Sequence, residues 1–153
     1  MFGKRVGFLI SLFVLTILAG CGQDVDRKAA VLISSKCAVD VIAGEKRDVV
    51  WMKPGVISFS GWAADSNSST VPAALDILIT DLNSNVRTSY KVSGRLDRPD
   101  VVKYFNQPTL LKSGFKANID LSGLAKGTYG VSLQMPVKHG AIICSTKKAV
   151  RII

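Results

Sequence analysis

The feature that most limits the fold of this chain is the spacing of its apolar residues. From residue 128 to 135, for example, Tyr129, Val131, Leu133 and Met135 alternate with small or polar residues. A period of two is typical of a β-strand with one buried face. Such runs recur about every ten residues and are separated by Gly, Pro, Asn and Ser, a pattern typical of two-sheet β proteins. We therefore expect an all-β antiparallel sandwich of about seven strands or more.

The expected strand segments follow from these runs and from the turn residues between them. They cover residues 31–33, 37–43, 49–52, 56–63, 74–82, 86–92, 114–121, 128–135 and 142–152. One further segment, 99–105, is expected to be helical. Pro99 suits a first helical turn, and Val101, Val102 and Phe105 share one face at helical spacing.

The N-terminal segment has the pattern of an export signal. Lys4 and Arg5 precede an apolar stretch over residues 6–18. As a helix this stretch would span about 20 Å, which is shorter than the roughly 30 Å of a bilayer core. A signal peptide therefore fits better than a stable membrane span.

The residues that follow, Leu18-Ala19-Gly20-Cys21, resemble the lipobox of bacterial lipoproteins. The resemblance implies that residues 1–20 are a signal peptide and that Cys21 becomes a lipid-anchored N-terminus. Residues 21–29 are then a tether and 30–153 the β-sandwich domain. Two or more acyl chains suffice for stable membrane anchoring. Gly22 follows the cysteine, which by the same resemblance permits sorting to the outer membrane, facing the periplasm or the surface.

Two cysteines remain, Cys37 and Cys144. In the oxidising compartment that an exported protein reaches, a single disulfide between them is the simplest expectation; a pair of buried thiols is the alternative. With only His139 as a further ligand, they are too few for a zinc site. We expect no metal and no cofactor.

The second half of the chain carries several short motifs together. They are Gly61-Trp62-Ala63-Ala64-Asp65, Arg98-Pro99-Asp100-Val101, Ser113-Gly114-Phe115, Asp120-Leu121-Ser122-Gly123-Leu124 and Gly127-Thr128-Tyr129. They resemble immunoglobulin-like β-sandwich modules that are appended to some bacterial cell-surface glycosyltransferases. The resemblance implies that Trp62 packs in the core and that none of these residues is catalytic.

The candidate ligand-binding residues are Trp51, Arg98, Lys103 and Tyr104. Trp51 and Tyr104 would offer ring faces to a sugar, with partial burial in the core as the alternative. Arg98 and Lys103, together with Arg95 and Lys112, would form a basic end of the domain suited to phosphate or acidic glycan. The alternative is that Arg98 stabilises the fold and the others are solvated.

We expect a non-enzymatic envelope lipoprotein, because the sequence has no nucleophile, phosphate loop or metal-ligand pattern. The chain has 153 residues and a net charge of +9; without residues 1–20, which include Lys4 and Arg5, it keeps +7. This charge favours anionic neighbours, although an exported protein would rarely meet nucleic acid. A protein partner in the envelope ranks first, an acidic glycan or lipopolysaccharide second, and inhibition of a cell-wall hydrolase third.

Overall fold

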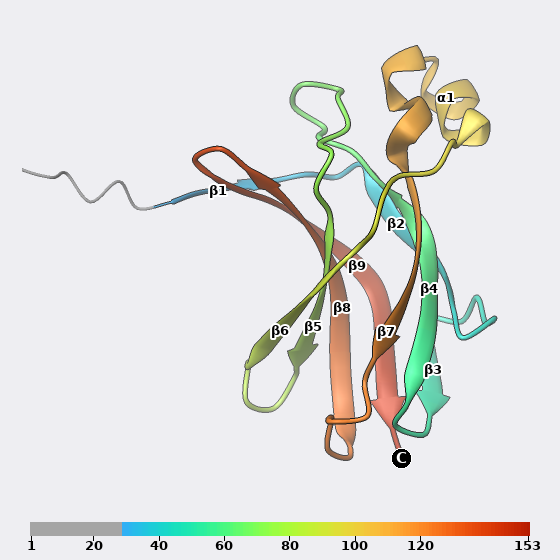
Figure 1. Ribbon diagram of the computed structural model, residues 1–153, viewed down its shortest axis with the longest axis vertical. Coiled ribbons are helices and arrows are strands. Elements are labelled where there is room, and N and C mark those ends of the chain that lie inside the picture. Colours follow the sequence, from blue (N-terminus) through green and yellow to red (C-terminus); the bar gives the residue numbers. More distant parts are fainter. Residues whose placement is uncertain (1–28) are drawn as a thin grey trace, which may run out of the picture.

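The computed structural model describes residues 29–153, which form nine strands and two short helices (Figure 1). The elements are β1 (Ala30–Ile33), β2 (Cys37–Ile42), β3 (Val49–Met52), β4 (Val56–Ala63), β5 (Asp76–Asp81), β6 (Arg87–Lys91), α1 (Pro99–Phe105), the 3-10 helix η1 (Pro108–Ser113), β7 (Gly114–Asp120), β8 (Gly127–Val137) and β9 (Gly140–Ile152). The predicted all-β sandwich with one short helix is confirmed. The predicted signal peptide, Cys21 and most of the predicted tether lie outside the described residues.

The larger sheet is built on the long hairpin of β8 and β9. Its strands follow the order β1-β9-β8-β5-β6, and β3 also pairs with β9. The β9–β8–β5–β6 pairings are antiparallel, whereas β1 and β3 pair with β9 in parallel, β1 near its start and β3 near its end. The expectation of antiparallel pairing is therefore met except along the outer edge of β9.

The smaller sheet has the order β2-β4-β7 and is antiparallel throughout. Strands β2 and β4 approach closely at Gly61: a Cβ at this position would lie 2.1 Å from the carbonyl oxygen of Ala38. Only glycine permits this approach without a shift of the backbone, which explains Gly61 inside a strand.

The core lies between the two sheets, as the alternation predicted. Tyr129, Val131, Leu133 and Met135 of β8 are all buried. They pack in one cluster with side chains of the smaller sheet, including the fully buried Phe59. Buried apolar area of this kind is the main source of stability in a small domain.

A disulfide joins Cys37 to Cys144, which confirms the predicted bridge. Cys37 begins β2 in the smaller sheet and Cys144 lies within β9 in the larger one, with 6.3 Å between their Cα atoms. The bridge therefore connects the two sheets through β2 and β9, the second and the last strand of the described residues.

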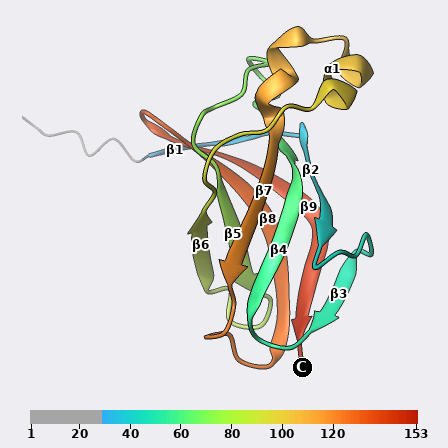
Figure 2. The same ribbon diagram turned by 45° about the vertical axis from the view of Figure 1, so that its right-hand side comes forward.

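The connection from β6 to β7 crosses from one sheet to the other and carries both helices. Helix α1 has the predicted bounds; η1 was not predicted. Figures 1 and 2 show both helices over the end of the sandwich opposite the C-terminus. A second, smaller apolar cluster forms there from Ala64, Val101 and Leu110, with Trp62 and Phe105 packed against it.

We predict that removing the disulfide by the double change Cys37→Ser/Cys144→Ser lowers the melting temperature by several degrees. The bridge joins residues 107 positions apart, and a loop of this length contributes up to about 4.7 kcal/mol in the chain-entropy model. Thermal unfolding by circular dichroism checks this, with the wild-type protein in reductant as the matched control. An unchanged melting temperature, with free thiols in the oxidised wild type, would contradict the bridge.

Candidate functional site

A cavity of about 370 Å³ lies between helix α1 and the adjacent end of the smaller sheet. It is lined by Trp62, Arg98, Asp100, Val101, Tyr104 and Phe105. Trp62 comes from β4, and the other five come from α1 and the residue before it. We call this cavity the aromatic cleft. Mixed apolar and polar lining in a concave site is the usual composition of a binding pocket.

The three aromatic rings of the cleft contact one another in sequence. Phe105 lies between its neighbours, 5.6 Å from Trp62 and 4.9 Å from Tyr104 between ring centroids, both edge to face. Tyr104 is 83% exposed. The helix therefore holds one large aromatic side chain almost entirely in solvent, at the rim of an otherwise packed aromatic group.

The charged side of the cleft is an ion cluster around Arg98. Its Nη1 donates to Asp40 at 2.8 Å, and its Nη2 donates to Asp100 at 2.7 Å. The hydrogen bond to Asp100 raises the pKa of Arg98, and the reciprocal bond lowers the pKa of Asp100 to about 2. Asp40 lies in β2, so the cluster ties the helix start to the smaller sheet. One cation against two carboxylates leaves the cluster with a net negative charge.

The other predicted basic residues near this end differ in how far they are neutralised. Arg95 is half-buried and donates to the carbonyl oxygens of Pro72 and Ser113 at 2.8 and 3.1 Å; burial lowers its pKa to about 10. Lys112 pairs with Asp97 at 2.6 Å. Lys103 is exposed and forms no ion pair within residues 29–153. Among the four basic residues predicted at this end, only Lys103 has no carboxylate or carbonyl partner within residues 29–153.

Lys36 contacts Phe105, which lines the cleft, and it was not among the residues predicted from the sequence. Its Nζ donates to Gln107 at 2.8 Å and to Ser69 at 3.0 Å, and it lies 5.2 Å from the ring centre of Phe105. A cation over an aromatic face is a favourable contact. The sequence gives no local signal for this role, because Ser69 and Gln107 lie far from Lys36 along the chain.

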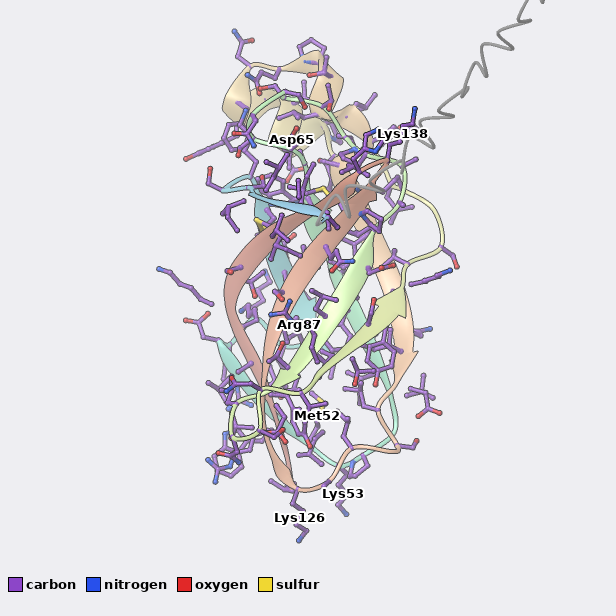
Figure 3. The ribbon with its side chains drawn as sticks, turned by 90° about the vertical axis from the view of Figure 1, so that its left-hand side faces the viewer. Met52, Lys53, Asp65, Arg87, Lys126 and Lys138 are labelled. Carbon is purple, nitrogen blue, oxygen red and sulfur yellow. A yellow bond between two sulfur atoms is a disulfide. The ribbon has the colours of Figure 1, made fainter. Side chains whose placement is uncertain are left out.

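A polar loop after β4 contacts the helical connection beside the cleft. The carboxylate of Asp65 accepts hydrogen bonds from the backbone N–H groups of Asn67 and Ser68 and from the Ser68 hydroxyl, which lower its pKa. Thr109 of η1 donates to the Ser69 carbonyl at 2.7 Å. Figure 3 shows Asp65 at the helical end of the molecule and Lys126 at the other end.

Trp51, the fourth predicted ligand residue, is not part of this cleft. It lies on β3, which Figure 1 places at the end opposite α1. Trp51 is 55% exposed, and the Arg151 guanidinium stacks 4.7 Å from its ring centre. Trp62 was expected to pack in the core but is only half-buried and lines the cleft. Strand alternation gave a signal for this, since Trp62 lies on the face of β4 opposite Phe59.

Residues 29–153 contain no group of three or more His, Cys, Asp or Glu side chains placed to hold a metal ion. Within the same residues, no helix is long and apolar enough to cross a membrane. In the comparisons with known proteins, no family model, curated protein or solved structure matches this chain.

We predict that Arg98→Gln destabilises the fold by about 1 kcal/mol at neutral pH, a value discounted for the solvent exposure of both carboxylates. The pKa of Asp100 in the folded state, about 2, lies below its ordinary value of 3.8. The contribution of the pair is therefore complete above pH 3.8 and is lost as the pH falls through about 2.

Urea unfolding at several pH values checks this, and the difference between wild type and Arg98→Gln should shrink on acidification. Lys112→Gln is the matched control, because it breaks a more exposed pair with Asp97 and should have a smaller effect. A difference that stays constant from neutral to low pH would contradict an ionic role for Arg98.

Proposed function

We propose that this protein is a non-enzymatic lipoprotein of the bacterial envelope whose aromatic cleft binds a partner protein. The observation that carries the proposal is Tyr104, which is 83% exposed at the rim of the cleft. An exposed aromatic ring gains favourable burial when a partner covers it. Helix α1 and the Arg98 cluster fix its position before binding, which lowers the entropy cost of association.

The lining residues favour a protein over an acidic glycan. Trp, Tyr and Arg are the residue types that most often carry binding energy in protein interfaces, and the cleft contains Trp62, Tyr104 and Arg98. An anionic ligand would meet Asp40 and Asp100 beside Arg98, which disfavours it electrostatically. The acidic-glycan alternative retains Lys103 as its main support.

The envelope location in this proposal depends on Cys21. We predict that Cys21→Ala leaves an unprocessed or mislocalised precursor, because its thiol is the group that would receive the lipid. Membrane fractionation and intact-mass measurement check this, with Cys37→Ala as a control that removes a cysteine but keeps the anchor. Normal mass and membrane association of the Cys21→Ala protein would refute the lipoprotein assignment.

The cleft is tested by site-specific photo-crosslinking in the native envelope. A photoreactive phenylalanine analogue at position 104 should give a discrete protein adduct. The same analogue at position 56 should not, because Val56 also exposes a large apolar side chain, at 68%, but lies in a different part of the domain, at the start of β4.

In a pull-down of the identified partner, Tyr104→Ala should reduce recovery by about tenfold or more, the size expected for a binding hot spot, and Val56→Ala should not. No adduct at position 104, or equal recovery with both variants, would overturn the protein-binding proposal. An adduct containing carbohydrate instead of protein would support the glycan alternative.

A further inference from the structure

Strand β1 exposes an apolar surface that the rest of the domain leaves uncovered. Val31, Leu32 and Ile33 are 64%, 47% and 67% exposed, so both faces of the strand meet solvent. The strand at the other edge of the same sheet, β6, is also exposed but begins with Arg87 and ends with Lys91. Charged side chains are a common protection of edge strands, and β1 has none.

The turn between β8 and β9 extends this surface. The Ala30 N–H donates to the carbonyl oxygen of His139 at 3.0 Å, and Ala30 lies opposite Gly140 in the parallel register. A Cβ at Gly140 would lie 1.8 Å from the Ala30 carbonyl oxygen, so only glycine lets the strand approach the turn so closely. Val137 is 39% exposed, and Lys138 beside it forms no ion pair within residues 29–153. We call β1 together with residues 137–139 the β1 surface.

The position of this surface along the chain indicates what covers it. Eight residues separate Cys21 from Ala30, a segment that reaches at most about 30 Å when fully extended. If Cys21 carries lipid, β1 is therefore the first strand that the chain forms after it leaves the membrane. The acidic and basic residues of that segment, Asp24 and Asp26 against Arg27 and Lys28, balance in charge. Lys138 is then an additional positive charge close to the bilayer.

We propose that the β1 surface rests on the anionic lipid bilayer to which the protein is anchored; this rests on the lipid anchor in the proposed function. The apolar side chains of β1 enter the boundary between headgroups and acyl chains, and Lys138 faces anionic headgroups. Within the described residues β1 pairs only with β9, so its outer backbone groups have no partner strand. At headgroup depth these groups still bond to water, which deeper insertion would not allow.

Helix α1 and strand β1 both lie toward the end of the domain away from the C-terminus, but on opposite sides of it in Figures 1 and 2. Figure 3 shows Lys138 at the same end as Asp65. The aromatic cleft therefore stays open to a partner when the β1 surface rests on lipid.

The test uses the full processed protein reconstituted in vesicles of phosphatidylethanolamine and phosphatidylglycerol that contain a photoactivatable phospholipid. After irradiation, mass spectrometry maps the residues labelled by lipid. We expect the lipid label on residues 31–33 and 137–139 to be about tenfold more abundant than the label around Val56, because only the β1 surface would bury apolar side chains in lipid. Val31→Ser/Ile33→Ser should remove most of this excess, whereas the matched exposed change Val56→Ser should not. Replacing phosphatidylglycerol by phosphatidylcholine should reduce it.

Each other outcome has a distinct meaning. Uniform labelling, or labelling that avoids β1, overturns the β1 surface alone and leaves the cleft proposal standing. Absence of lipid labels together with concentration-dependent dimers that Val31→Ser/Ile33→Ser abolishes would show that β1 covers a second copy of the chain instead. Absence of acyl chains from Cys21 by intact mass would overturn the anchor and this inference with it. Tyr104→Ala, which affects only the cleft, should leave the β1 labels unchanged.

Discussion

The covalent link between the two sheets is the constraint on which the rest of this domain depends. The chain runs from β1 in the larger sheet to β2 in the smaller and back to β3 in the larger, and the Cys37–Cys144 disulfide fixes the first of these crossings. Lys36 and Asp40 flank Cys37, and both contact the helical connection, through Gln107 and Arg98 respectively. The bridge therefore also positions the segment that supports the aromatic cleft.

Elements defined by local periodicity were predictable from the sequence. Strand β4 and helix α1 have the expected bounds, because strand alternation in one and Pro99 with helical spacing in the other act over a few neighbouring residues. The parallel pairing of β1 and β3 with β9 was not predictable, since it joins segments about a hundred residues apart and leaves no local pattern. Helix η1 was missed because it is a 3-10 helix interrupted at Lys112, so its six residues do not follow the α-helical period.

The candidate site was predictable in its residue types but not in its charges. Arg98 and Tyr104 do meet in one cleft, as two of the four candidates, while Trp51 lies elsewhere. The positive charge expected at this end is largely compensated, because Asp40 reaches Arg98 from 58 residues away and Asp97 reaches Lys112. Net charge counts residues of each sign; which cations stay free depends on the folded neighbours of each one.

The two ends of the domain then differ in a way that suits an anchored binding protein. The end with α1, the Asp65 loop and the β8–β9 turn carries the aromatic cleft and the exposed strand β1, the first strand of the described residues. At the opposite end, Trp51 contacts Arg151 of the adjacent strand and the connections are short turns. If Cys21 carries the proposed lipid, the eight residues between it and Ala30 limit how far the domain can move from the bilayer. Recognition at this end then selects partners that are themselves close to the membrane. Specificity would then arise from location as well as from the shape of the cleft.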